Sequence, residues 1–166
     1  MTPEWSVPIV AARVPEAGQT VRADAEAPVR AAVAARLGVP GIDALAFEAR
    51  LVPTLGGAIA ASGTISVRLT QVCVITLEPF DSKLSVPFDL RFVARPDEAD
   101  ALDPDAPDEI ALEAGVLDLG EAVVQTLALA LDPYPHAPGA ALPESGTDAA
   151  AEGPFAALAR RRGGNA

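Results

Sequence analysis

Side chains that could carry out catalysis are scarce in this sequence. Its single histidine, His136, lies between Pro135 and Pro138, a context typical of a solvent-exposed loop and not of a general base. Neither a glycine-rich phosphate loop nor a nucleophile elbow is present, and Gly56 and Gly57 fit a hairpin turn. These observations predict a protein that is not an enzyme and has no small-molecule substrate.

Metal ligation is also poorly supported. A zinc site needs four ligands, and the single cysteine, Cys73, with one distant histidine cannot supply them. The acidic residues Asp100, Asp103 and Asp105 suggest a calcium loop, but the glycine and the closing glutamate of such a loop are missing. We therefore expect no metal and no cofactor, and we interpret Cys73 as a small hydrophobic residue that points inward.

Charge is unevenly distributed along the chain. The formal net charge is −11, and residues 96–135 hold 11 of the 23 acidic residues but no lysine or arginine. The remainder carries 12 acidic and 12 basic residues and is therefore neutral. The acidic stretch is either a solubilising loop or a docking surface for a basic partner. The candidate docking residues are Asp103, Asp105, Asp108 and Glu109.

Cationic residues recur on what we expect to be one face of a β-sheet. The candidate RNA-binding residues on this face are Arg50, Arg68, Lys83 and Arg91. Acidic residues are mixed among them, and no aromatic residue is interleaved with these cations, which excludes a platform on which bases stack. The face is either a solvated surface of mixed charge or a surface that contacts RNA directly.

The C-terminal end of the chain contains a second candidate site. From residue 137 onward Gly, Ala, Pro, Ser and acidic residues predominate, which is typical of disorder. Within this tail Phe155 and Leu158 would share one face of a short helix. Three arginines follow them: Arg160, Arg161 and Arg162. Such a segment either docks into a groove or binds phosphate when a partner orders it, or is a frayed end.

The remaining pattern predicts the elements that must position these residues. Residues 5–14 fit a short opening strand, and apolar residues at every fourth position predict a helix over about residues 24–37. Apolar and polar residues then alternate over residues 45–51, 58–70 and 84–92. This alternation predicts three strands.

Two irregularities interrupt the alternation. The alternation of apolar and polar residues is interrupted at Gln71 and Val72, where we expect a bulge or a bend. It resumes afterwards, with Cys73 and Leu77 expected to point inward. Pro87, which cannot donate a backbone hydrogen bond, predicts an edge position for the last of the three strands.

The apolar pattern over residues 119–131 predicts a second helix. Asp118 can cap its N-terminus, and Glu121 three residues later completes a capping box. Apolar residues surround this helix almost completely, so we expect it to be buried against the sheet. The predicted fold class is α+β: an antiparallel β-sheet, barrel-like if it closes, with two covering helices and a disordered C-terminal tail.

Length and composition limit the organisation of the chain. The 166 residues fit one domain, which we place at residues 1–136, followed by the tail at residues 137–166. No secretory signal opens the sequence, and the longest apolar stretch, residues 122–131, is too short to cross a membrane. These features predict a cytoplasmic protein without a membrane partner.

Residues 73–80, Cys-Val-Ile-Thr-Leu-Glu-Pro-Phe, resemble the signature of the YceD family of large ribosomal RNA subunit accumulation proteins. The residues that carry this signature are Cys73, Leu77, Pro79 and Phe80. Residues 37–43, 115–121 and 127–135 are similar to the alphaproteobacterial branch of the family, and residues 154–158 resemble its usual ending. The order and spacing of these segments make the resemblance specific.

The resemblance implies a bacterial, cytoplasmic, non-enzymatic factor for the synthesis, processing or accumulation of 23S ribosomal RNA. Its partner would be large-subunit rRNA or, as the alternative, a basic large-subunit ribosomal protein held by the acidic stretch. Many relatives carry a second cysteine three residues after the first, with an arginine just before it. Here Ile75 and Thr76 occupy those two positions, so no metal site is carried over, and an RNA contact at this turn is weakened.

Overall fold

The computed structural model describes residues 3–95 and 108–141. Two short 3-10 turns, η1 (Ala11–Arg13) and η2 (Leu55–Gly57), separate its strands. In chain order the strands and helices are β1 (Pro8–Val10), β2 (Gln19–Asp24), α1 (Ala27–Leu37), β3 (Gly41–Pro53), β4 (Ile59–Val72), β5 (Pro79–Val93), β6 (Asp108–Ala111), β7 (Val116–Asp118) and α2 (Leu119–Ala130).

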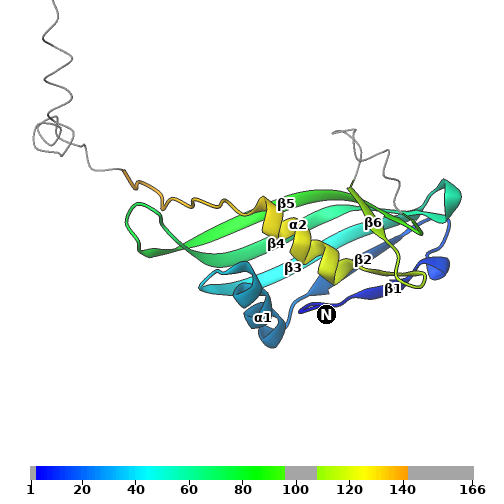
Figure 1. Cartoon of the computed structure of the whole chain (residues 1–166), viewed down its shortest axis with the longest axis horizontal. Helices are drawn as coiled ribbons and strands as arrows, with labels where there is room; N and C mark the ends of the chain where they lie inside the picture. Colours follow the sequence, from blue (N-terminus) through cyan, green and yellow to red (C-terminus); the bar gives the residue numbers. More distant parts are fainter. Residues whose placement is uncertain (1–2, 96–107, 142–166) are drawn as a thin grey trace, which may run out of the picture.

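Five strands form one sheet in the order β2-β3-β4-β5-β6, and β1 pairs with β7 in a separate two-stranded ribbon. Neighbouring strands are antiparallel except β5 and β6, which are parallel. The described sheet is open, with β2 and β6 at its edges, so the predicted barrel-like closure is wrong. The parallel pairing of β5 with β6 also means that the sheet is not purely antiparallel. Both helices lie over the same face of the sheet (Figure 1).

The alternation predicted for the three long strands is confirmed. The inward residues of β3 include Leu45, Phe47 and Leu51, each at most 3% exposed, and the odd-numbered residues of β4 continue this core. Gly63 interrupts the row because a side chain has no room there. A Cβ atom at this position would lie 2.0 Å from the Glu48 carbonyl oxygen.

The first predicted helix is confirmed, although it begins at Ala27 and not at residue 24. Pro28 lies in the first turn, where its missing N–H leaves no hydrogen bond unmade. Gly38 ends the helix with a left-handed φ of 67°, a conformation that costs glycine little. The opening strand is shorter than predicted, because only Pro8–Val10 is extended and paired, and β2 was not predicted.

Two predictions at the β4–β5 hairpin are wrong. The pairing of β4 with β5 passes Gln71 and Val72 without a register shift, and the irregularity lies instead between Ile42 and Ala44 of β3. Leu77 is 77% exposed and does not point inward. Its left-handed φ of 59° breaks the alternation at the tip of the hairpin.

Asp118 caps α2 as predicted, since its carboxylate accepts hydrogen bonds from the N–H groups of Gly120 and Glu121. The Glu121 side chain does not complete the predicted capping box but binds Arg36. The predicted burial of this helix is confirmed for Leu119, Val123 and Leu127, whereas Leu129 in the last turn is 85% exposed. Neither described helix is long and apolar enough to cross a membrane.

Pro87 lies where β5 has a free edge. β6 pairs only with residues 90–93 of β5, so residues 79–89 pair with β4 alone among the described strands. The predicted edge position is therefore confirmed for the part of the strand that contains Pro87.

Candidate nucleic-acid interface

No helix or strand of residues 3–95 and 108–141 covers the face of the sheet opposite the helices, which we call the uncovered face (Figure 1). This face is formed by the even-numbered residues of β3 and β4 and the odd-numbered residues of β5, because side chains alternate along a strand. Small hydroxyl residues, namely Ser62, Thr64 and Ser66, are exposed along its centre. The four cations predicted to share one face all lie on it.

Arg68 on β4 and Lys83 on β5 are direct cross-strand partners. Both residues are exposed, and no carboxylate of the described residues forms an ion pair with either one. Asp81, two residues before Lys83, accepts a hydrogen bond of 3.4 Å from the Thr70 hydroxyl. Arg68 and Lys83 therefore present two adjacent positive charges to solvent. Like charges directly opposite each other repel.

The other two predicted cations are bound within the protein. Arg50 donates a hydrogen bond to the carbonyl oxygen of Ala17. Arg91 forms an ion pair of 3.2 Å with Glu109 on β6. The structure therefore brings together Arg68 and Lys83 but does not gather all four cations into one cluster.

A shallow concavity of about 570 Å³ lies over β2, β3 and β4 on the same face. At its wall Arg22 of β2 forms an ion pair with Glu48 of β3. The hydrogen bond from Arg22 holds the pKa of Glu48 below its usual value. Arg22 was missed as a member of this face because β2 itself was not predicted.

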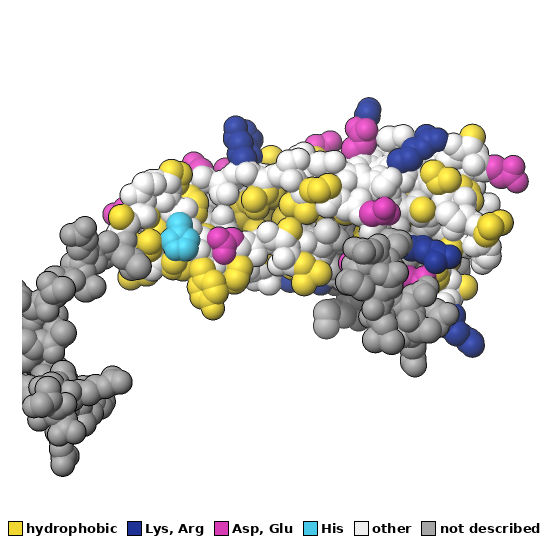
Figure 2. Space-filling view, turned by 90° about the horizontal axis from the view of Figure 1, so that it is seen from above, with side chains coloured by type: hydrophobic (Ala, Val, Ile, Leu, Met, Phe, Trp, Pro, Cys, Tyr) yellow, Lys and Arg dark blue, Asp and Glu magenta, His cyan; other side chains and the backbone are white. Residues whose placement is uncertain are grey.

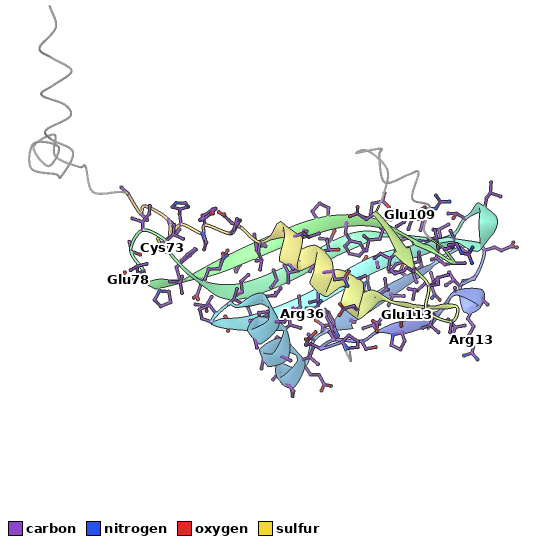
Figure 3. All side chains as sticks on the ribbon, viewed as in Figure 1. Arg13, Arg36, Cys73, Glu78, Glu109 and Glu113 are labelled. Atoms are coloured by element: carbon purple, nitrogen blue, oxygen red, sulfur yellow. The ribbon has the colours of Figure 1, made fainter. Side chains whose placement is uncertain are left out.

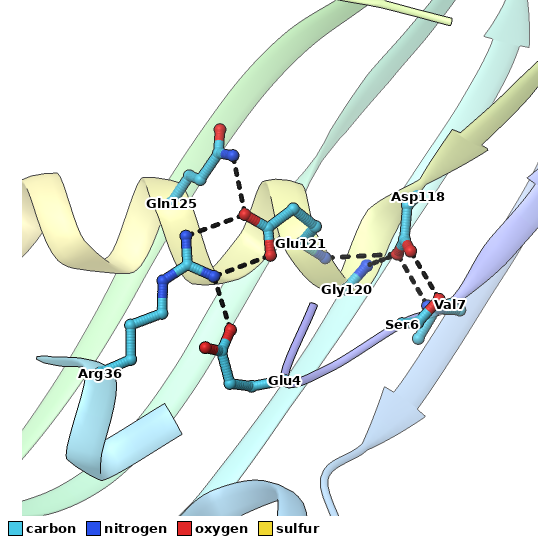
Figure 4. Close-up of polar contacts among 8 residues, drawn as sticks. All are labelled: Glu4, Ser6, Val7, Arg36, Asp118, Gly120, Glu121 and Gln125. Atoms are coloured by element: carbon cyan, nitrogen blue, oxygen red, sulfur yellow. Dashed lines mark hydrogen bonds and ion pairs between the residues drawn. The ribbon is translucent and has the colours of Figure 1, made fainter. Parts of the chain in front are cut away.

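A second cleft, of about 450 Å³, lies among the N-terminal segment, β7 and α2. Among the described residues that line it, four carry carboxylates and one, Arg36, carries a positive charge. The carboxylates belong to Glu4, Glu113, Asp118 and Glu121. Arg36 donates hydrogen bonds of 2.7 Å to Glu4 and 2.8 Å to Glu121 (Figure 4).

These contacts bias the protonation of the cleft. The hydrogen bond from Arg36 is the largest cause that lowers the pKa values of Glu4 and Glu121, and the same bonds raise the pKa of Arg36. Asp118 also accepts hydrogen bonds from the Ser6 hydroxyl and the Val7 N–H. Sequence patterns could not reveal these pairs, because their partners lie 32 to 112 residues apart.

The signature residues of the resemblance lie at the tip of the β4–β5 hairpin, where Figure 3 labels Cys73 and Glu78. Cys73 is fully buried, as predicted. Hydrogen bonds from the backbone of Ala137 and from the side chain and backbone of Thr76 lower the pKa of its thiol to about 6. Leu77 is exposed, Pro79 begins β5 and Phe80 is half-buried. Within residues 3–95 and 108–141 no three metal-binding side chains lie close enough to hold a metal.

Several predicted residues lie outside the described part of the chain. They are Asp103, Asp105, Phe155, Leu158, Arg160, Arg161 and Arg162. Of the predicted acidic docking residues, Asp108 begins β6 and is exposed, whereas Glu109 binds Arg91. His136 is exposed on the segment after α2.

The family model described as "Large ribosomal RNA subunit accumulation protein YceD" matches residues 61–159. This span is more than half of the chain and includes most of β4 and all of β5, β6, β7 and α2. Arg68, Lys83 and the hairpin tip therefore lie within it. No curated protein and no solved structure is significantly similar to the chain.

Proposed function

This chain belongs to the YceD family of large ribosomal RNA subunit accumulation proteins, and we propose that it supports the accumulation of 23S rRNA by binding that RNA. The resemblance of residues 73–80 predicted this family, and the family match confirms it. The proposed role is that of a bacterial cytoplasmic factor that acts during synthesis, processing or accumulation of the RNA.

The pairing of Arg68 with Lys83 is the observation that carries the proposal. Cross-strand partners have Cβ atoms about 5 Å apart, so both cations can reach one phosphate group or two adjacent ones. Their mutual repulsion is unfavourable in the free protein. A bound phosphate offsets this repulsion, which favours an anionic ligand at this position over a purely solvated role.

The residues around the pair indicate how RNA would be contacted. Ser62, Thr64 and Ser66 offer exposed hydroxyls along β4, and the uncovered face of β3, β4 and β5 carries no aromatic side chain. These groups suit phosphates and 2′-hydroxyls and do not suit stacking on bases. We therefore expect contacts to the RNA backbone with little sequence preference.

The proposal requires no catalytic step. Gln71 is the one buried polar residue of the described chain, and the histidine is exposed. Burial and converging titratable groups are what tune side chains for acid–base chemistry. The uncovered face offers cations and hydroxyls for binding but no such arrangement.

Filter binding of the full chain to 23S rRNA fragments at low and moderate salt tests this function. We expect Arg68→Gln/Lys83→Gln to weaken binding about tenfold at low salt, and to reduce the slope of log affinity against log salt by about 1 to 2. Both changes are expected because the variant loses two contacts to RNA phosphates.

The matched control removes the same charge elsewhere. Arg13 on η1 and Arg95 after β5 are both exposed, and Arg13→Gln/Arg95→Gln is expected to retain most of the affinity. Equal losses in the two double variants would show that only net charge matters. Absence of a salt slope in the wild-type protein would overturn direct RNA binding.

A second candidate function rests on the acidic cleft. Among the described residues there, Glu4, Glu113, Asp118 and Glu121 outnumber one cation, Arg36. Strand β6 beside the cleft begins at Asp108, within the acidic stretch of residues 96–135. A cleft with more carboxylates than cations has a negative potential and attracts basic proteins. The protein would then act as an adapter that holds a basic large-subunit ribosomal protein.

A pull-down of large-subunit ribosomal proteins separates the two functions. Asp108→Asn/Glu113→Gln changes two exposed carboxylates and leaves intact the ion pairs of Arg36 with Glu4 and Glu121. Loss of a ribosomal-protein partner with unchanged RNA binding favours the adapter. An unchanged set of partners excludes Asp108 and Glu113 as docking residues for such a partner.

A further inference from the structure

The β4–β5 hairpin, the end of α1 and the end of α2 enclose a groove of about 590 Å³. Its lining is mainly apolar, and its charged lining residues are Arg36 and Asp132. The larger apolar side chains that line it are Leu37, Val39, Val72, Val74, Leu77 and Leu131. A groove of this size and polarity is suited to a few apolar side chains of a peptide.

Hydrophobic side chains at this end of the molecule are open to solvent. Leu77 is 77% exposed, and Val72 and Val74 are each 42% exposed. Leu129 and Tyr134, near the end of α2, are 85% and 69% exposed. Figure 2 shows hydrophobic side chains on the surface around the single histidine. Grouped exposed apolar residues of this kind mark an interaction site.

The backbone holds Leu77 in its exposed position. Its left-handed φ of 59° is unfavourable for a residue with a branched side chain. The turn is nevertheless closed by hydrogen bonds of 2.9 Å, from the Leu77 N–H to the Cys73 carbonyl and from the Cys73 N–H to the Glu78 carbonyl. Backbone strain persists only where the surrounding structure holds it, and strained residues cluster at binding and active sites. A strained residue that presents an apolar side chain to solvent therefore points to binding.

We infer that residues 154–159 of this same chain bind in the groove, with Phe155 and Leu158 as the apolar contacts. These two residues are three positions apart in the sequence, a spacing that would place them on one side of a helical turn. Among residues 142–166 the large apolar side chains are Leu142, Phe155 and Leu158, so this pair is the segment's one closely spaced apolar pair. The family match also extends through residue 159.

The course of the chain after α2 brings this segment within reach. The Val74 N–H donates to the Pro135 carbonyl at 2.9 Å, and the backbone of Ala137 hydrogen-bonds to Cys73. The chain therefore follows the hairpin as it leaves the body. From Ala141 to Phe155 it can extend up to about 46 Å. Binding within one chain also benefits from a high effective concentration.

Charge supports the same placement. Asp132 lines the groove, and Glu78, which directly follows Leu77, is exposed. Arginines 160–162 directly follow the proposed apolar contacts. With residues 154–159 in the groove, these cations lie near the two carboxylates, which favours the bound state.

Hydrogen exchange of the full-length protein tests the inference. The Val74 and Leu77 amides report on the groove, because Val74 bonds the hairpin tip to the segment after α2 through the Pro135 carbonyl and Leu77 closes the tip itself through the Cys73 carbonyl. In Phe155→Ser/Leu158→Ser we expect these two amides to exchange at least about fivefold faster than in the wild type. Leu142→Ser, a tail substitution outside the proposed segment, is expected to leave both rates unchanged.

A substitution in the groove tests the same contact from the other side, so that the result does not depend on the tail variant alone. Leu77→Ser is expected to accelerate exchange at Phe155 and Leu158. Leu55→Ser is the matched control, because Leu55 is 95% exposed at the other end of β4. Unchanged Val74 and Leu77 rates in the tail variant overturn the inference. Protection that disappears on dilution together with a halving of molecular mass also overturns it, since the groove would then bind a second copy.

Discussion

Arg36 at the end of α1 donates hydrogen bonds of 2.8 Å to both carboxylate oxygens of Glu121 in the first turn of α2. The two residues are 85 positions apart, and Glu4 of the N-terminal segment accepts a further bond from the same guanidinium. One side chain therefore connects the two helices that cover the sheet and the segment that precedes β1.

Arg36→Gln is expected to lower the free energy of unfolding by about 1 kcal/mol. A two-pronged arginine–carboxylate contact is among the stronger ion pairs, but the Arg36 side chain is 32% exposed, which weakens the contact through solvent screening. Urea denaturation checks this value. Arg22→Gln is the control, because the Arg22–Glu48 pair is more exposed and its loss should leave the midpoint unchanged.

Acid should remove the contribution of this contact. Arg36 holds the folded pKa values of Glu4 and Glu121 below 4.5. Carboxylates with lowered pKa values stabilise the fold above the unfolded value, and this stabilisation is lost as pH falls through the folded one. We expect the stability difference between wild type and Arg36→Gln to be constant near neutral pH and to shrink below about pH 4.5. A difference independent of pH would contradict this expectation.

The Cys73 thiol should ionise near pH 6 in the folded protein. The absorbance of the thiolate near 240 nm measures this directly, since the chain has one cysteine. In denaturant the midpoint should return to about 8.5. Because the folded pKa is lowered, the thiolate contributes stability that is complete above the unfolded pKa and is lost as pH falls through about 6. A folded midpoint near 8.5 would show that the Ala137 and Thr76 contacts are not formed.

Two leucines on α2 provide a matched pair for testing the core. Leu127 is fully buried and Leu129 is 85% exposed. Leu127→Asp should reduce the free energy of unfolding by about 4 kcal/mol or more, because it loses apolar packing and places a carboxylate in the core. Leu129→Asp should leave it almost unchanged. Thermal melts of the two variants check the orientation of the helix, which would be wrong if both melted alike.

The long strands were predictable because their side chains alternate over many residues. Leu45, Phe47 and Leu51 follow one period, and this period alone placed Arg68 and Lys83 on the opposite face. The short strands β6 and β7 were not predictable, because three or four residues carry too little pattern, and β1 was predicted only as part of a longer opening strand. Their pairing depends on tertiary contacts between distant segments.

The candidate site was predictable only in part for the same reason. Alternation identifies which face a cation occupies but not what it binds. The contacts of Arg50 with Ala17 and of Arg91 with Glu109 span 33 and 18 residues, beyond the reach of local patterns. Leu77 was misplaced because one left-handed residue changes the direction of the side chain in a tight turn.

Residues 79–89 of β5 pair with β4 alone among the described strands. An edge of this length can template the growth of the sheet by another molecule, which is how exposed strands initiate aggregation. Pro87 removes one N–H from this edge, and Lys83 places a charge on it. Both are means by which soluble proteins block strand addition. The face that we propose for RNA binding thus ends in a border that resists self-association.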